Sequence, residues 1–279
     1  MATFLLVHGA WHDERCWELL VPELHARGHA AHVLTLPGHW DRQLPSYQVS
    51  LKRYGQAICN AAEQIGEPLV LVGHSLGGMA ISQAAEMKPD LFHHMVYLAA
   101  YVPRVDSWTR ARGLAISDNS THMWSKIKTN WWTFTVDIIR EHASDLFYHD
   151  CEPQLAERAS NRLCRQSGRP LVEYLRVTDA RCGAISKTYI ECLEDRVISP
   201  DLQLRMQEHL PFDRVLTLDS SHSPFLSQPQ KLAKLFHSIV APESDERKVT
   251  QVSNSPTTAA LEMTYPQSGL NEKRSKFSA

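Results

Sequence analysis

Six short stretches of the chain are apolar almost without interruption, and longer polar or amphipathic segments separate them. A strand that is buried on both faces of a parallel sheet carries such a continuous apolar run, whereas a half-exposed strand alternates. The pattern therefore predicts six strands, most of them inside a parallel sheet. Their predicted ranges are Thr3–His8, His32–Leu36, Leu69–His74, Met95–Ala99, Thr188–Leu193 and Val215–Leu218.

Helical periodicity fills the segments between these strands. One helix is predicted over Cys16–Arg27 and another over Leu51–Ile65, because each pattern ends directly before a glycine, a residue that often closes helices. A third helix is predicted from Leu76 to just before Pro89. The alternation of strands and helices predicts an α/β fold with a mostly parallel, doubly wound sheet that is covered by helices on both faces.

Residues 104–186 interrupt the alternation. This stretch has helical patterns and many aromatic residues but no convincing buried strand. A connection of this length has structure of its own. We therefore interpret it as a mostly helical cap, inserted into a core formed by residues 1–103 and 187–241.

Four of the seven tryptophans of the chain lie in the predicted cap: Trp108, Trp124, Trp131 and Trp132. Packing of the cap on the core explains each of them singly. As a group they indicate an apolar cavity under the cap, since ligand pockets are mostly apolar and aromatic and lie at domain interfaces. We expect Trp124, Trp131 and Trp132 to line this cavity and to bind substrate.

Composition limits the partners and the compartment. The chain has 279 residues, 43% of them hydrophobic, and a net charge of −2, so it lacks the basic excess of nucleic-acid-binding proteins. No stretch approaches the length of a membrane span, and the first strand begins at once, without the pattern of a secretory signal. The scattered cysteines indicate reduced thiols in a cytoplasmic protein. They are Cys16, Cys59, Cys151, Cys164, Cys182 and Cys192.

The last segment, residues 242–279, differs from the rest of the chain. It is rich in Ser, Thr, Glu, Lys, Asn and Gln and has no strong helical or strand period. This composition predicts a disordered tail, although docking on a partner stays open.

A nucleophile elbow is the most specific motif of the chain. The pentapeptide Gly73–Gly77 has the pattern G-x-S-x-G, with a predicted strand before it and a predicted helix after it. The sharp turn between them strains the backbone of Ser75 and points its Oγ out of the sheet, where a base can reach it. Small residues two positions to either side are needed for this turn.

A serine nucleophile needs a base and an acid, which follow it along the chain in the order acid, then histidine. Two predicted strands after the cap end in fitting residues, Asp195 and His222. The carboxyl ends of parallel strands share one sheet edge, so both residues are expected beside Ser75. His222 alone among the fifteen histidines has the right order and position; His74 is expected to point away from the Ser75 Oγ.

Other carboxylates compete for the role of the acid. Asp195 is favoured over Glu194, Asp201 and Asp219, because Asp219 is too close in sequence to His222 to support it from a neighbouring strand.

The first predicted strand ends in His8-Gly9-Ala10-Trp11. A glycine at this place lets the backbone approach a substrate closely. We expect the backbone N–H groups of Ala10 and Leu76 to form an oxyanion hole, which suits the tetrahedral intermediate of acyl transfer.

Together these motifs resemble the methylesterase/hydroxynitrile lyase branch of the α/β-hydrolase superfamily. The segments that carry the resemblance are His8–His12 with Cys16–Trp17, Gly73–Gly78, the Asp195 segment and His222–Pro229. The resemblance runs from about Thr3 to Val240. Phe147–Cys151 and Thr188–Ile190 are most similar to bacterial carboxylesterases of this branch, among them enzymes that cleave pyrethroid esters and the methyl ester of anthracyclines.

The resemblance implies a triad of Ser75, Asp195 and His222, with Ala10 and Leu76 as oxyanion donors. It also implies neither a metal nor an organic cofactor. The substrate would be a small-molecule ester, small to medium in size and hydrophobic.

Two departures separate the hydrolases of this branch from its lyases. The lyases that the chain resembles carry Thr where this chain has Gly9, and Lys directly after the catalytic histidine, where it has Ser223. Ester hydrolysis is therefore favoured; a lyase and a non-catalytic small-molecule receptor remain as alternatives. A further departure is Asp13-Glu14, in place of small residues, which would either disfavour anionic substrates or face solvent.

Overall fold

The computed structural model describes residues 1–39, 44–121 and 123–241. The tail predicted for residues 242–279 lies outside the described residues. Within the described part of the chain, no helix is both long and apolar enough to cross a membrane.

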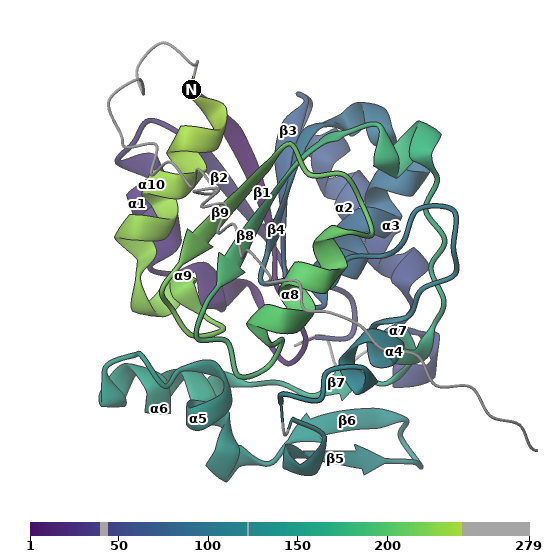
Figure 1. Ribbon diagram of the computed structural model, residues 1–279, viewed down its shortest axis with the longest axis vertical. Helices are drawn as coiled ribbons and strands as arrows, with labels where there is room; N and C mark the ends of the chain where they lie inside the picture. The colour runs from purple at the N-terminus through teal and green to yellow at the C-terminus, as the bar shows by residue number, and fades with distance from the viewer. Residues whose placement is uncertain (40–43, 122, 242–279) are drawn as a thin grey trace, which may run out of the picture. The chain divides into compact units, whose positions relative to one another are not determined.

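The core is a six-stranded sheet in which all strands run parallel, in the order β2-β1-β3-β4-β8-β9 (Figure 1). The strands are β1 (Thr3–Val7), β2 (Ala30–Leu34), β3 (Leu69–His74), β4 (Phe92–Leu98), β8 (Ser186–Cys192) and β9 (Arg214–Leu218). The predicted α/β fold with a mostly parallel sheet is confirmed, and all six predicted strands are present.

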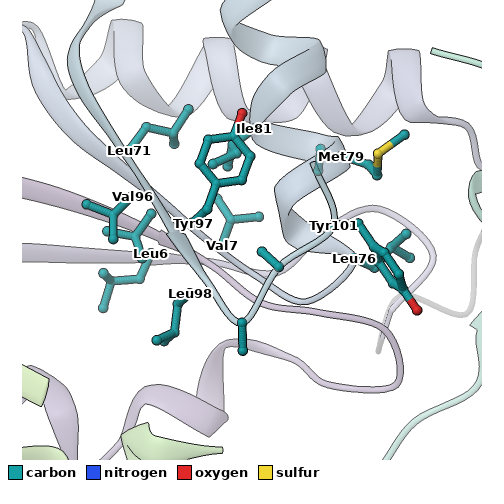
Figure 2. Close-up of a cluster of buried hydrophobic side chains, with 14 of the residues drawn as sticks. Leu6, Val7, Leu71, Leu76, Met79, Ile81, Val96, Tyr97, Leu98 and Tyr101 are labelled. Atoms are coloured by element: carbon teal, nitrogen blue, oxygen red, sulfur yellow. The ribbon is translucent and has the colours of Figure 1, made fainter. Parts of the chain in front are cut away.

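Central and edge strands differ in burial. β1 and β3 are buried along their whole length, as their continuous apolar runs predict. β2 and β9 are the edges of the sheet, and there Val33 and Val215 are 40% and 45% exposed. Figure 2 shows the middle of the core, where Leu71 and Tyr97 lie on the sheet face that carries Ile81 of the following helix, and Leu6 and Val96 lie on the other face.

Helices cover both faces of the sheet. In Figure 1, α1 and α10 lie together on one face, and α2 and α3 lie together on the other. The helices of the core are α1 (Leu20–His25), α2 (Leu51–Ile65), α3 (Gly77–Met87), α8 (Pro200–Gln207), α9 (Pro224–Ser227) and α10 (Pro229–Val240). The prediction for α2 is confirmed at both ends, and Gly66 closes this helix with a φ of 79°.

The predicted helix Cys16–Arg27 is shorter than expected. A 3₁₀ turn over Glu14–Trp17 precedes α1, which begins only at Leu20. Pro22 explains the late start, because proline is tolerated in the first turn of a helix but not in its interior.

The segment between β4 and β8 forms the cap, and it is not as helical as predicted. Among its described residues it contains four α-helices, short 3₁₀ and π turns, and a three-stranded antiparallel sheet in the order β5-β6-β7. Its elements are α4 (Ala111–Ile116), β5 (Ile127–Asn130), β6 (Thr135–Ile138), α5 (Ala143–Phe147), α6 (Pro153–Arg162), β7 (Gln166–Ser167) and α7 (Arg169–Val172). These strands are two to four residues long and β5 is mostly exposed, so they leave no apolar run in the sequence.

Candidate active site

Ser75 occupies the turn between β3 and α3 and has a φ of 55°, in the left-handed region that non-glycine residues rarely adopt. Its backbone is held on both sides: its N–H donates to the Leu98 carbonyl at 3.2 Å, and its carbonyl accepts the Tyr101 N–H at 3.1 Å. A β-carbon at Gly77 would lie 2.9 Å from the His8 carbonyl oxygen. The elbow therefore needs a small residue at this place.

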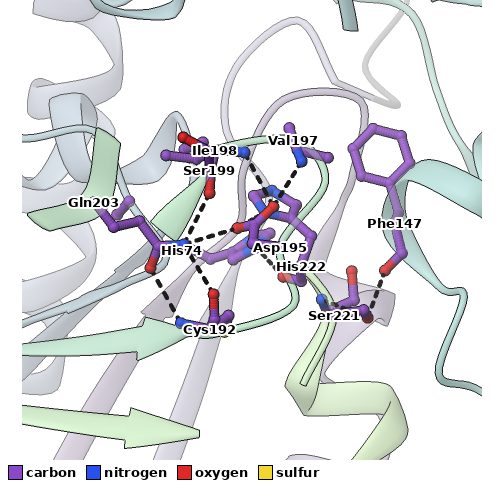
Figure 3. Close-up of polar contacts among 12 residues, drawn as sticks. His74, Phe147, Cys192, Asp195, Val197, Ile198, Ser199, Gln203, Ser221 and His222 are labelled. Carbon is purple, nitrogen blue, oxygen red and sulfur yellow. Dashed lines mark hydrogen bonds and ion pairs between the residues drawn. The ribbon is translucent and has the colours of Figure 1, made fainter. Parts of the chain in front are cut away.

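Asp195 and His222 form a buried pair at the same edge of the sheet (Figure 3). Asp195 follows β8 and His222 follows β9; the imidazole Nδ1 donates to Asp195 Oδ2 at 2.7 Å, and the two side chains are at most 1% exposed. Asp195 Oδ1 accepts the N–H groups of Val197 at 2.7 Å and Ile198 at 3.0 Å. The carboxylate is thus fixed in place and orients the ring with Nε2 away from it.

The competing carboxylates lie elsewhere. Glu194, Asp201 and Asp219 are exposed, and among the described residues Asp195 is the carboxylate that hydrogen-bonds to His222. The structure therefore brings together Asp195 and His222, as the sequence predicted.

No hydrogen bond links His222 to Ser75 in this structure. His222 Nε2 is buried and has no hydrogen-bond partner within the described ranges. Catalytic hydrogen bonds are often long or poorly aligned without substrate and tighten in the complex. Because Nδ1 donates to Asp195, Nε2 remains as the ring nitrogen that can accept a hydrogen bond.

The loop after β1 lies against the nucleophile. A β-carbon at Gly9 would lie only 2.7 Å from Ser75 Cβ, so any other residue at position 9 collides with it. Ala10 and Leu76 line the same cavity as Ser75, and neither N–H group donates to another group in the part of the chain that the structure describes. Two free donors thus lie beside the nucleophile.

The cavity over Ser75 is small and mostly apolar, with a volume of ≈ 20 Å³. That is room for about one water molecule. Residues 1–103 and 187–241 contribute Ala10, Trp11, Ser75, Leu76, Tyr101 and Val197; residues 104–186 contribute Ala111, Arg112, Ala115, Met123, Trp124, Ile127, Val136 and Leu171.

Trp124 is the one member of the predicted tryptophan group that lines this cavity. The prediction for Trp131 and Trp132 is wrong: their residues are 79% and 99% exposed. They lie in the turn between β5 and β6, where Asn130 Oδ1 accepts the N–H groups of Trp132 and Thr133 and closes the turn tightly. A hairpin tip directs its side chains into solvent, and the sequence did not reveal this hairpin.

Trp11 lines the cavity instead and was missed. Its φ is 63°, and its indole N–H donates to the Val136 carbonyl of β6 at 2.8 Å. It therefore connects the loop after β1 to the three-stranded sheet of the cap. The tetrapeptide His8-Gly9-Ala10-Trp11 contains this tryptophan, but its pattern predicted only a role for the backbone.

Buried histidines surround the site, and each donates to a backbone carbonyl. His12 Nδ1 donates to the Ala10 carbonyl at 2.7 Å, and His74 Nε2 donates to the His222 carbonyl at 2.8 Å (Figure 3). Burial lowers the pKa of His12 to about 4 and that of His74 well below its ordinary value. Both rings are therefore neutral near pH 7 and serve as fixed donors. The contact of His74 with the His222 backbone agrees with a ring directed away from the Ser75 Oγ.

Asp13 does not face solvent. Its carboxylate is buried and bonded to the Arg15 guanidinium, with a closest approach of 2.5 Å, whereas Glu14 is exposed. Although burial raises the pKa of Asp13, the hydrogen bonds from Arg15 outweigh it and hold that pKa below its usual value. The charge of Asp13 is thus compensated, which leaves it little effect on an anionic substrate.

Residues 4–235 match the model of the Alpha/beta hydrolase family. Methyl jasmonate esterase 1 of Vitis vinifera is 27% identical over 85% of this chain and 96% of its own length. Pyrethroid hydrolase of Sphingobium wenxiniae is 28% identical over 84% of this chain and 86% of its own length. The chain spans only 63% and 55% of two longer chloroplastic relatives from Arabidopsis thaliana. The resemblance to the methylesterase branch is confirmed, because the jasmonate esterase and the pyrethroid hydrolase are both carboxylic ester hydrolases.

Solved structures agree. A pyrethroid hydrolase from Sphingobium faniae JZ-2 superposes with a TM-score of 0.76 at 25% identity, covering 85% of this chain and 96% of that one. Polyneuridine aldehyde esterase gives a TM-score of 0.78 at 22% identity over 86% and 100% of the two chains, which shows a shared fold.

Proposed function

Because this chain belongs to the alpha/beta hydrolase family, we propose that it is a serine carboxylesterase that hydrolyses a small-to-medium hydrophobic ester. The observation that carries the proposal is the buried Asp195–His222 pair, with a bond of 2.7 Å, on the sheet edge that also bears the Ser75 elbow. This is the set of groups that nucleophilic acyl transfer needs, held in the chain order of the fold.

The reaction follows from the roles of these groups. Ser75 Oγ attacks the ester carbonyl while His222 Nε2 takes its proton, and Asp195 stabilises the resulting imidazolium. The tetrahedral intermediate places its negative oxygen at the N–H groups of Ala10 and Leu76. The intermediate then expels the alcohol, which takes the proton from His222 and leaves an acyl group on Ser75. A water molecule, activated in the same way, releases the acid.

Gly9 supports hydrolysis over lyase chemistry. A β-branched residue at this position would need room that Ser75 Cβ already fills, since even a β-carbon would lie 2.7 Å from it. Position 9 therefore carries no hydroxyl beside Ser75, in contrast to the lyases of this branch. Ser223, which is fully buried, carries no charge that would hold a departing anion.

The proposed substrate class rests on the lining of the cavity. Apolar side chains such as Trp124, Met123 and Leu171 bury an apolar acyl or alcohol group. The present volume of ≈ 20 Å³ does not hold an ester. Binding therefore requires wall residues of the cap to move apart.

A substrate panel with a nucleophile variant tests the proposal. The panel contains methyl esters of aromatic acids, short p-nitrophenyl esters and bulky esters such as pyrethroids. The rate of ester hydrolysis should be lower in Ser75→Ala than in the wild type by about 10³-fold or more, and the melting temperature should be unchanged. Turnover in Ser75→Ala near the wild-type rate would refute the mechanism, and a folded wild type inactive on every ester would favour a receptor.

A further inference from the structure

Phe147–Asp150, at the end of α5, is a part of the cap that contacts two of the loops bearing the candidate catalytic groups. Phe147 and Asp150 bond to the loop that carries His222, and Tyr148 bonds to the loop that carries Ala10. We call these four residues the α5 clamp.

On the histidine side, both bonds of the α5 clamp go to Ser221, which directly precedes His222 (Figure 3). The Ser221 N–H donates to Asp150 Oδ2 at 2.9 Å, and the Ser221 hydroxyl donates to the Phe147 carbonyl at 3.1 Å. Ser221 is fully buried. The backbone and the side chain of Ser221 are therefore both bonded to the cap. These bonds fix the backbone at the residue directly before His222.

On the oxyanion side, a chain of two bonds leads from the cap to the backbone. The Tyr148 hydroxyl donates to His12 Nε2 at 2.8 Å, and His12 Nδ1 donates to the Ala10 carbonyl at 2.7 Å. Burial raises the pKa of Tyr148 well above its usual value and lowers that of His12 to about 4. Both groups are therefore neutral. The Tyr148 hydroxyl is the donor in the first bond, and His12 Nδ1 is the donor in the second.

Contacts of the same region with the acid loop are weaker. His149 Nε2 lies 3.8 Å from Glu194 Oε2, and the Glu194 side chain is 61% exposed. Asp195 is instead held by its own loop, through Val197 and Ile198. The α5 clamp thus acts on the base and on the oxyanion donors rather than on the acid.

We propose that the α5 clamp is a positioning element for the esterase reaction, with Asp150 setting the place of His222 and Tyr148 setting that of the Ala10 peptide through His12. This inference rests on the proposed function. It implies that the clamp stays docked during turnover, because lifting it would release both loops.

The test uses two variants of the full chain, Asp150→Ala and Tyr148→Phe, and one rescue variant, Asp150→Asn. Misplacement by about 1 Å costs up to 10²-fold in rate, so we expect kcat to fall about 10- to 100-fold in the first two, with KM within about twofold. Asp150→Asn should recover most of the rate, since its amide oxygen can accept the Ser221 N–H.

Matched controls are Asp137→Ala and Tyr174→Phe, also in the cap. Asp137 makes an exposed ion pair with Arg165 at 3.5 Å, and Tyr174 is 52% exposed. Both controls should keep the wild-type kcat. If the controls lose as much activity as Asp150→Ala and Tyr148→Phe, the effect is not specific to the α5 clamp and the proposal is wrong.

Labelling of Ser75 by a fluorophosphonate separates this proposal from the proposed function, because it needs an activated nucleophile but no knowledge of the ester. Labelling of the wild type together with slow labelling of Asp150→Ala and Tyr148→Phe supports the clamp. If the two variants are labelled at 25 °C as fast as the wild type and differ only in a lower melting temperature, the α5 clamp is a structural contact and the proposal is wrong. Should Asp150→Ala not fold, Tyr148→Phe, which removes only one oxygen, still tests the proposal. A folded wild type that is not labelled overturns both proposals.

Discussion

The two sides of the Ser75 cavity are held by different forces. The side that bears the chemistry is fixed by directed, buried hydrogen bonds, among them those of Asp195 to His222 and of Asp150 to Ser221. The opposite wall, formed by cap residues such as Met123, Trp124 and Ile127, packs on the hydrophobic core, and the indole bond of Trp124 stays within the cap, to the Ala115 carbonyl.

This difference assigns a different task to each side. Hydrogen bonds specify distance and angle, so they suit groups that must meet a transition state. Apolar contact has no preferred direction and tolerates changes of shape. Changes on the fixed side should therefore lower kcat for every ester, and changes in the wall should alter KM according to the size of the ester.

The largest effect is expected for Asp195→Asn, on the fixed side. An amide there favours the wrong imidazole tautomer, so kcat should fall by up to about 10⁴-fold for small and bulky esters alike, with KM near normal. Steady-state kinetics on p-nitrophenyl acetate and on a bulky ester measure this. Asp219→Asn, at an exposed position, is the control; a larger loss there than in Asp195→Asn would show that the acid is assigned wrongly.

Gly9→Ala should have the next largest effect. The new methyl group would lie 2.7 Å from Ser75 Cβ, so the loop after β1 must shift. Overpacking of this kind costs about 1–3 kcal/mol of stability, and the displaced Ala10 N–H should lower kcat about 10²-fold. Gly28→Ala is the control for strain without a collision, since its φ is +76° but an added methyl there meets nothing within 4 Å; it should lower stability and leave kcat unchanged. A normal kcat in Gly9→Ala would show that the loop after β1 accommodates the methyl group without displacing the Ala10 N–H, and would contradict its place on the fixed side.

Acid should weaken the fixed side before it affects the wall. Burial lowers the pKa of His12 and of His39 to about 4, below the unfolded value of 6.5. Between pH 6.5 and 4 the unfolded chain therefore binds more protons than the folded one, and stability falls as the pH falls. Melting temperatures across this window should drop less in His39→Asn than in the wild type. The exposed His25, replaced by Asn, should leave the curve unchanged; equal curves for all three proteins would contradict the assignment.

The smallest effect belongs to the wall. Trp124→Ala should raise KM about 10-fold for a bulky aromatic ester and hardly at all for p-nitrophenyl acetate, because only the bulky ester buries that indole surface. Trp132→Ala, at the exposed hairpin tip, is the matched control and should change neither value. A uniform loss across substrates in Trp124→Ala would make this tryptophan an anchor of the cap instead.

The sequence predicted what local patterns determine. Continuous apolar runs identified the strands of the parallel sheet, and a five-residue motif with its flanking elements identified Ser75. His222 followed from chain order, and Asp195 from its place after a strand. These features depend on a few neighbouring residues, so their signals are concentrated.

What the sequence did not predict depends on packing between distant segments. The bond from Ser221 to Asp150 joins residues 71 positions apart, and that from Tyr148 to His12 joins residues 136 positions apart. Exposure is equally hidden, because Trp131 and Trp124 are the same residue type in one stretch. Only the turn between β5 and β6 decides that the first faces solvent.

The shared direction of the six strands has a practical consequence. Every group of the site follows the carboxyl end of a strand, whereas Met1 lies at the opposite end, directly before β1, and is fully exposed (Figure 1). A linker attached to the N-terminus would leave the mouth of the cavity and the cap free to move. The enzyme could thus be tethered to a bead or an electrode surface by this end, with its working face toward the solution.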